Sequence, residues 1–566
     1  NQQQMNNLKT KPGIGYYCIV FIWAMTCFAF FQFWYHYHFF YQEQNQLFLW
    51  SSDYLVTYLD KPGWLACMAG DFLTQFYYYL YAGPIILTLT LLLLGYNVRC
   101  ALQAADIKGR LWPCLIALTT MTIGAMLSLH YDYRLSNIFA LIGGANVFVA
   151  STKTLTFTRF WVKRLEKKVV GEEMIDPTLP HWISAISIFI TIPVCHWFFG
   201  SGIWIYAILV IIGCLMHIGQ SRNYLRLGSL VLAMFLLMLT KRIYFVDFKQ
   251  LYTCPNFGKF VKPEFELEKT FAVDCEYYFG NYNKVISIME KEEYPDKYMK
   301  FYYNLVVAQN KSLSDNLLRY PNNNLGTFET LAPGTSPLTI KTIGELYWLL
   351  GDMTFAERAT ILANVSSPFS RNIRYVKRLA EINLVKGDLN AARKYLRILK
   401  KTWVWNRWAT RIFAALGHHA SQEERATLQP YLDKRPFINT RDTLRLNDNC
   451  YTIMRELVES NPANNLAINY MLCSDLLLKD METFKHDYDA YYLKQKHVLY
   501  DPLYQEALMI YLAGTNAAPS EWAKYIKRTD LLQQFKQYNN QRGSAAFSGT
   551  YWYYFDKATT PKLQQQ

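Results

Sequence analysis

Residues 15–35 read Gly15-Tyr-Tyr-Cys-Ile-Val-Phe-Ile-Trp-Ala-Met-Thr-Cys-Phe-Ala-Phe-Phe-Gln-Phe-Trp-Tyr35, and no charged side chain interrupts them. A helix needs about 20 apolar residues to cross the hydrocarbon core of a membrane, so this run is long enough for one span. A cleaved signal peptide has a shorter apolar region followed by a small-residue cleavage site, which this aromatic run lacks. We therefore predict a membrane-spanning helix that stays in the mature chain.

Charged residues are scarce throughout the first part of the chain, where six further apolar stretches follow. Residues 1–245 hold 17 Lys and Arg and 10 Asp and Glu, whereas residues 246–566 hold 41 and 34. A backbone in lipid must satisfy its own hydrogen bonds, which favours helices. The sequence predicts an all-α protein with a polytopic membrane bundle over 1–245 and a soluble domain over 246–566. About seven spans are expected, at 14–35, 77–97, 112–130, 136–151, 182–199, 202–218 and 228–245.

The basic residues of the first part predict its orientation. Thirteen of the 17 Lys and Arg precede the first span or fall between spans 2 and 3, 4 and 5, and 6 and 7, and such loops stay in the cytoplasm. The other four are Lys61, Arg134, Lys241 and Arg242. We expect a multi-pass protein of a bacterial inner membrane, with a cytoplasmic N-terminus and a periplasmic C-terminal domain, or a luminal one in a eukaryote. Because topology explains much of the basic excess, nucleic acid is not an expected partner.

Three segments of the C-terminal part share a pattern in which a helix ends at Gly. The glycines are Gly280, Gly351 and Gly387, spaced 71 and 36 residues apart, close to two and one periods of the ~34-residue tetratricopeptide repeat. Gly at such a turn supplies the left-handed backbone with which many helices end. A degenerate copy is expected around Lys479-Asp480. We predict a tetratricopeptide-like α-solenoid, whose concave face would bind a protein partner or acceptor.

The segment between the first two spans, residues 36–76, is the longest loop on the predicted periplasmic side. It contains Glu43, apolar residues at helical spacing over 46–59, a break at Pro62-Gly63 and a second short helical stretch over 64–74. An amphipathic helix of this kind lies in the membrane interface. A simple anchor has no need of such a loop, so we expect this segment to carry the function.

This order of features resembles the conserved module of the GT-C integral-membrane glycosyltransferases. Glu43, Tyr54 and Asp60-Lys61-Pro62 look like the acidic residue, the aromatic helix and the Lys-Pro segment that follow the first span of the aminoarabinose and protein O-mannosyl transferases. The repeat part is similar to the transmembrane-and-tetratricopeptide O-mannosyltransferases. The chain also resembles uncharacterised inner-membrane proteins of Bacteroidota. The GT-C resemblance implies that a sugar passes from a polyprenyl-phosphate donor to a protein or glycan acceptor.

The resemblance places the catalytic base among the acids of the outer loop. In enzymes of this type a carboxylate at the membrane surface takes the proton of the acceptor hydroxyl while the donor phosphate leaves. Burial raises the pKa of such a carboxyl towards a useful range. We choose Glu43 as the base, with Asp53 and Asp71 as second choices. The alternative for Glu43 is a solvated charge beside the membrane.

Arg134, Lys241 and Arg242 are the candidates for binding the lipid phosphate, because Arg can bind phosphate through two N–H groups. The alternative for Lys241 and Arg242 is that their long side chains extend so that the charged ends contact lipid headgroups. A divalent metal is a weaker expectation, with His130 and Asp132 as candidate ligands.

Two functions stay open at this point. Besides the glycosyltransferase, the sequence fits a non-enzymatic, membrane-anchored scaffold for an envelope or secretion complex, because a solenoid serves both. A disulfide between Cys254 and Cys275 suits an oxidising compartment, and buried thiols are the alternative. The chain opens Asn1-Gln-Gln-Gln-Met5, so either Met5 is the initiator or the printed sequence starts within a longer chain.

Overall fold

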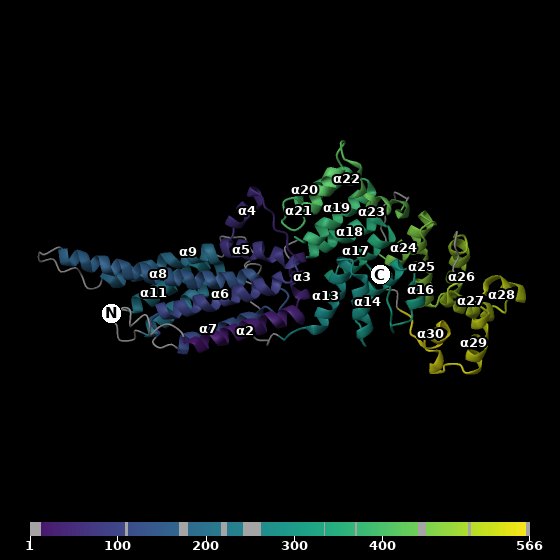
Figure 1. Cartoon of the computed structure of the whole chain (residues 1–566), viewed down its shortest axis with the longest axis horizontal. Coiled ribbons are helices and arrows are strands. Elements are labelled where there is room, and N and C mark those ends of the chain that lie inside the picture. Colours follow the sequence, from purple (N-terminus) through teal and green to yellow (C-terminus); the bar gives the residue numbers. More distant parts are fainter. Residues whose placement is uncertain are drawn as a thin grey trace. The chain divides into compact units, whose positions relative to one another are not determined.

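The computed structural model describes residues 13–107, 111–168, 179–216, 223–240, 262–332, 334–367, 371–439, 449–495 and 500–561. Helices dominate these ranges (Figure 1), and the only extended pairing in them is an isolated bridge between Thr330 and Asn449. The predicted all-α class is thereby confirmed. The chain forms two compact units: unit 1 comprises Asn1–Phe265 and Lys401–Val404, and unit 2 comprises Glu266–Lys400 and Trp405–Gln566.

Unit 1 contains long apolar helices joined by shorter ones. Four segments are long and apolar enough to cross a membrane: Ile14–Phe33, Ala82–Ala104, Leu135–Thr154 and His181–Met216. The stretch predicted at 112–130 and the described part of the stretch predicted at 228–245 coincide largely with the shorter apolar helices Leu111–Leu127 and Asn223–Leu239. The elements are α2 (Ile14–Phe33), α3 (Tyr37–Gln44), α4 (Ser52–Leu59), α5 (Trp64–Thr74), η1 (Gln75–Tyr78), α6 (Ala82–Ala104), α7 (Leu111–Leu127), α8 (Leu135–Lys168), α9 (Leu179–Phe199), η2 (Gly200–Gly202), α10 (Ile203–Met216) and α11 (Asn223–Thr240).

Small residues allow the helices of unit 1 to pack closely. A Cβ added at Gly70 of α5 would lie 2.5 Å from the backbone nitrogen of Ser136 in α8. A Cβ added at Gly144 of α8 would lie 2.1 Å from the carbonyl oxygen of Gly202. Backbones approach each other in this way in membrane bundles, where small residues line the helix interfaces. The short helix α5 is therefore held against α8 at a fixed distance.

Unit 2 is built of short helices that pack mainly against their neighbours in sequence. They are α13 (Phe265–Tyr278), α14 (Tyr282–Lys291), α15 (Lys297–Gln309), α16 (Leu313–Asn316), α17 (Pro337–Leu350), α18 (Met353–Ser366), α19 (Ile373–Lys386), α20 (Leu389–Leu399), α21 (Asn406–Ala415), α22 (Gln422–Ala426), α23 (Gln429–Leu432), η4 (Arg435–Phe437), α24 (Cys450–Ser460), α25 (Asn465–Leu478), α26 (Met481–Asp487), η5 (Tyr488–Tyr492), α27 (Pro502–Gly514), α28 (Pro519–Tyr525), α29 (Thr529–Asn540), η6 (Ala545–Phe547) and α30 (Tyr551–Lys557).

Three of the four predicted turns of unit 2 share one local structure; the fourth also has a positive φ at Gly280, but the side chain of the following Asn281 makes no capping hydrogen bond to α14. Gly351, Gly387 and Lys479 end α17, α19 and α25 with positive φ angles of 97°, 83° and 59°, as expected from their place in the pattern. Each is followed by an Asp whose carboxylate accepts a backbone N–H of the next helix: Asp352 from Phe355, Asp388 from Ala391, and Asp480 from Thr483. A left-handed residue ends one helix and an N-capping Asp begins the next. The same two-residue turn therefore forms three helical hairpins.

Two of these glycines differ in what surrounds them, and this leads to a prediction. Gly351→Ala is expected to destabilise its hairpin by roughly 2–4 kcal/mol, because the residue has a positive φ and the new Cβ would lie 2.4 Å from the carbonyl oxygen of Phe437. Gly280→Ala is the matched control: its φ is also positive, but nothing lies within 4 Å of its Cβ position, so we expect about 1–2 kcal/mol. Hydrogen exchange of the adjoining helices in the full chain measures both. Equal losses would contradict the role of the Phe437 contact.

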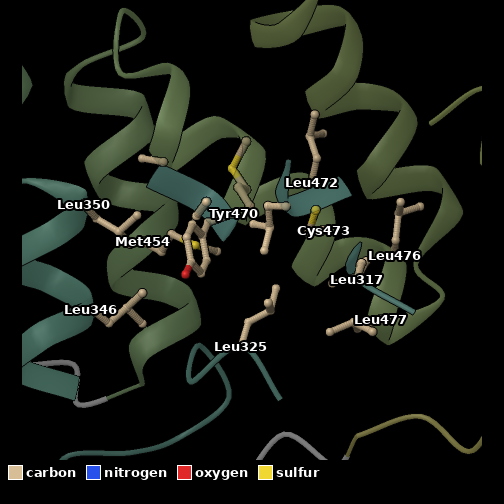
Figure 2. Packing of buried hydrophobic residues seen from close by; sticks show 14 of the residues in the cluster. Leu317, Leu325, Leu346, Leu350, Met454, Tyr470, Leu472, Cys473, Leu476 and Leu477 are labelled. Carbon is tan, nitrogen blue, oxygen red and sulfur yellow. The ribbon is translucent and has the colours of Figure 1, made fainter. Parts of the chain in front are cut away.

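The hydrophobic core of unit 2 surrounds α25 (Figure 2). Tyr470, Leu472, Cys473, Leu476 and Leu477 of this helix are all at most 1% exposed. They are surrounded by leucines and Met454 from α17, α24 and the segments around α16. Apolar residues on most faces of α25 explain why this helix is buried on nearly every side.

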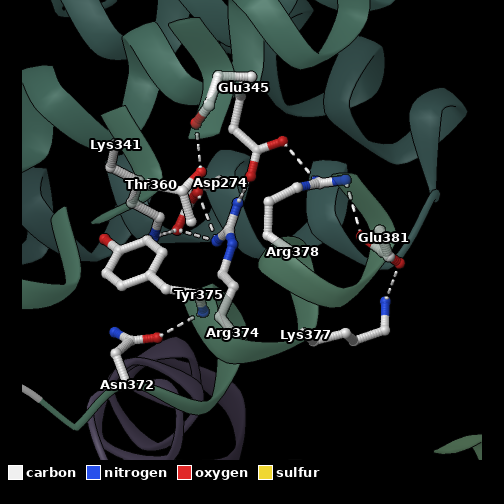
Figure 3. A network of polar contacts seen from close by, with 11 residues as sticks. Asp274, Lys341, Glu345, Thr360, Asn372, Arg374, Tyr375, Lys377, Arg378 and Glu381 are labelled. Atoms are coloured by element: carbon white, nitrogen blue, oxygen red, sulfur yellow. Dashed lines mark hydrogen bonds and ion pairs between the residues drawn. The ribbon is translucent and has the colours of Figure 1, made fainter. Parts of the chain in front are cut away.

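An ion network inside unit 2 joins α13, α17 and α19 (Figure 3). Arg374 of α19 is 1% exposed, and its Nη1 lies 2.9 Å from Asp274 Oδ1 while its Nη2 lies 2.9 Å from Glu345 Oε1. Lys341 also pairs with Asp274, and Arg378 Nη2 lies 2.7 Å from Glu345 Oε2. Burial alone would raise the pKa of Asp274, but Arg374 and Lys341 hold it at about 2. Both carboxylates are thus ionised in the interior, and each is paired.

Several residues named in the sequence analysis lie outside the described residues. These are Met5, Lys241, Arg242 and Cys254. Cys275 is buried in α13.

Candidate functional site

Three short helices and η1 connect α2 to α6, where the sequence predicts the long outer loop. The helix expected over 64–74 is confirmed as α5. The helix expected over 46–59 begins only at Ser52, because residues 46–50 lie outside any helix and Ser51 has an extended backbone. The prediction omitted α3 (Tyr37–Gln44), most of whose side chains are buried. We call α3, α4, α5 and η1 the outer layer.

Glu43 lies on α3 and is 5% exposed, so the solvated alternative does not describe it. No hydrogen bond or ion pair in the described part of the chain engages its carboxyl group, and burial raises its pKa to about 8. The adjacent Gln42 donates through Nε2 to the carbonyl oxygens of Tyr131 (3.3 Å) and Tyr133 (3.0 Å). The α7–α8 loop therefore fixes α3, and with it Glu43, which is largely protonated at neutral pH.

Asp71 lies on α5 and has partners at both carboxylate oxygens. Arg134 Nη2 lies 2.5 Å from its Oδ1, and Tyr58 of α4 donates through its hydroxyl to Oδ2 at 2.8 Å. Tyr54 lies one turn earlier on α4, with its hydroxyl 3.1 Å from that of Tyr58, and donates to the carbonyl oxygen of Leu47. Burial alone would lower the pKa of Arg134, but Asp71 raises it above its usual value. The Arg134 ion pair and the Tyr58 hydrogen bond of Asp71 thus join α5 to the loop before α8 and to α4.

The two acids are held by the same loop but do not form one contact cluster. Glu43 makes no ion pair with Arg134, whose side chain pairs with Asp71. However, Tyr133, which accepts from Gln42, directly precedes Arg134 in the chain. A single loop therefore positions the buried Glu43 carboxyl on one side and the Asp71–Arg134 ion pair on the other.

The remaining candidates are exposed or outside the described residues. Asp53 lies exposed in the first turn of α4, 3.5 Å from Ser52 Oγ. His130 and Asp132 are exposed in the α7–α8 loop, and His130 Nδ1 accepts the backbone N–H of Asp132 at 3.2 Å. Within the described ranges, no three side chains of His, Cys, Asp or Glu gather as a metal site. His130 and Asp132 alone do not fit a metal centre.

Three polar contacts that hold the outer layer were not predicted from the sequence. Tyr54 and Tyr58 stand four residues apart, which places them on one face of a helix, and this spacing was a usable signal. The position of Gln42 directly beside Glu43 was a second usable signal in the sequence. The pairing of Asp71 with Arg134, 63 residues apart, has no local signal in a single sequence.

Comparison with known proteins gives a family and no activity. No curated protein and no solved structure matches the chain. One family model, described as a family of unknown function (DUF6057), matches residues 12–558. Since the match covers almost the whole chain and both units, the chain belongs to the family of unknown function DUF6057.

Proposed function

We propose that this protein is a membrane-bound glycosyltransferase of the GT-C type, which moves a sugar from a polyprenyl-phosphate donor to a protein or glycan acceptor. The observation that carries the proposal is Glu43: a buried carboxyl without a hydrogen-bond or ion-pair partner among the described residues, on the layer of short helices that joins the first two long apolar helices. An unpaired acid is costly to bury, so its presence there suggests a role beyond folding. Perturbed carboxyls of this kind cluster at catalytic sites.

The proposed step uses Glu43 of the outer layer and Arg134 of the α7–α8 loop. Ionised Glu43 takes the proton of the acceptor hydroxyl as that oxygen bonds to the anomeric carbon of the sugar. The bond between the anomeric carbon and the phosphate oxygen breaks, and its electron pair leaves with the polyprenyl phosphate. Arg134, with Lys241 and Arg242, would stabilise the phosphate charge. Asp71 would act by holding Arg134 in place.

The topology that we propose has seven spans, a cytoplasmic N-terminus and unit 2 in the periplasm of a bacterial inner membrane. It rests on the apolar helices α2 and α6 to α11 and on the distribution of Lys and Arg between them. Unit 2 would be a tetratricopeptide-like solenoid that holds the acceptor or a partner. The repeated turns at Gly351, Gly387 and Lys479 support this, because they build hairpins of the kind such repeats stack.

Glycan analysis in cells tests the proposal. A strain that lacks this chain is complemented with the native protein, with Glu43→Gln or with Asp53→Asn as the matched exposed acid. We expect mass spectrometry of envelope proteins and glycans to show a sugar that the deletion and Glu43→Gln both lack and Asp53→Asn retains. Unchanged glycans in the deletion strain would contradict the proposal and favour the membrane-anchored scaffold.

A further inference from the structure

The α20–α21 hairpin carries an unusual concentration of positive charge. Residues 389–422 contain seven Lys and Arg and no Asp or Glu. Four of the seven are exposed side chains on the two helices: Lys394 and Arg397 on α20, and Arg407 and Arg411 on α21. Each pair is three or four residues apart, so its members share one helix face. We call these four residues the basic surface.

No ion pair neutralises the basic surface in the part of the chain that the structure describes. Some other exposed cations of unit 2 do have acidic partners, such as Lys284 with Glu276 and Arg542 with Asp556. Arg397 instead lies over the ring of Phe413, 6.0 Å from its centroid, and Lys394 lies 5.7 Å from the centroid of Tyr395. The positive field of the hairpin therefore remains available to an external anion.

The inner side of the hairpin is firmly packed, which fixes where the cations point. Leu396, Leu399 and Ala409 are fully buried. Lys377 of α19 lies 4.7 Å from the ring centroid of Trp405 and 5.2 Å from that of Trp408. The exposed charges thus stand on a preformed scaffold and need little ordering to bind.

We propose that the basic surface docks on the headgroups of anionic lipids in the membrane that holds the apolar helices. Charge complementarity selects the partner, because an anionic leaflet attracts clusters of Lys and Arg and lies within reach of any domain tethered to membrane helices. This inference is independent of the proposed glycosyl transfer.

Hydrogen exchange of the full chain in lipid nanodiscs tests this docking. We expect exchange of peptides from 389–416 to be at least about tenfold slower in nanodiscs with phosphatidylglycerol than in nanodiscs of phosphatidylcholine alone. High salt should abolish the difference by screening the charges. The variant with Lys394, Arg397, Arg407 and Arg411 all replaced by Gln should exchange alike in both lipids.

A matched variant controls for the loss of four charges. In this control, Gln replaces four exposed cations elsewhere in unit 2: Lys291, Lys311, Lys524 and Lys536. The control variant should keep the native difference in exchange between the two lipids. Equal exchange of the native protein in both lipids, or an equal loss in both variants, would overturn the proposal. Protection by soluble polyglutamate in phosphatidylcholine nanodiscs, without protection by phosphatidylglycerol, would likewise overturn it and assign the surface to an acidic protein.

Discussion

The native protein is expected to become less stable as the pH rises from about 4 to about 8, and the Glu43→Gln variant is expected not to show this decrease. The pKa of Glu43 is about 8 in the folded protein, against about 4.3 in an unfolded chain. Below pH 4 the carboxyl is protonated in both states and has no effect. Between the two pKa values only the unfolded state is ionised, so the native state binds the extra proton and stability falls as pH rises. The cost is complete above pH 8.

The expected size of this effect follows from the separation of the two pKa values. At about 1.36 kcal/mol per pKa unit, the native protein loses on the order of 5 kcal/mol across the window. Curves of α3 amide protection against pH from 5 to 8.5, measured by hydrogen exchange in the full native chain and in Glu43→Gln, give the difference. Asp53→Asn removes an exposed acid from the same outer layer and should keep the native slope. Parallel curves for the native chain and Glu43→Gln would show that Glu43 is hydrated.

Arg374→Met is expected to destabilise the packing of α13, α17 and α19 by about 3–5 kcal/mol. Arg374 is 1% exposed and pairs with both Asp274 and Glu345. Its removal leaves two buried carboxylates short of a positive partner, and Met fills the volume without replacing the charge. Because the chain has two units, a single global unfolding curve is not informative. Hydrogen exchange of the α17 and α19 amides in the full chain measures the local loss.

Two controls separate charge from packing in this prediction. Lys386→Met removes a cation of the same helix whose partner Glu357 lies 2.6 Å away, with both side chains partly exposed, and should cost less than about 1 kcal/mol. Adding Asp274→Asn and Glu345→Gln to Arg374→Met should restore part of the stability, because the uncompensated charges are gone. A triple variant less stable than Arg374→Met would mean that the contacts of the carboxylates matter more than their charge.

Local patterns in the sequence predicted a large part of the helical structure. The apolar stretches, α5 and the turns at Gly351 and Gly387 follow from composition, spacing and the backbone preference of glycine, which act over a few residues. The predicted start of the helix that became α4 was wrong. The apolar spacing of this helix extends backwards through residues 46–50, but these residues are not helical. Hydrophobic spacing alone does not show where a helix begins.

The polar contacts inside both units could not be predicted in this way. Arg374 and Asp274 stand 100 residues apart, and Arg134 and Asp71 stand 63 apart. Their pairing is created by tertiary packing, which the order of residues along one chain does not reveal. The same holds for Glu43: its position after the first span suggested a role, but its burial depends on the neighbouring helices and loop.

The most direct test of the proposed function is the release of polyprenyl phosphate by the purified full chain. The protein in nanodiscs is supplied with a polyprenyl-phosphate sugar and an acceptor extract from the deletion strain. We predict release by the native chain and by Asp53→Asn, a rate that rises with pH towards about 8 as Glu43 ionises, and a fall of about 10²–10⁴-fold for Glu43→Gln. Release by Glu43→Gln at the native rate, with the same pH profile, would contradict the assignment of Glu43 as the base.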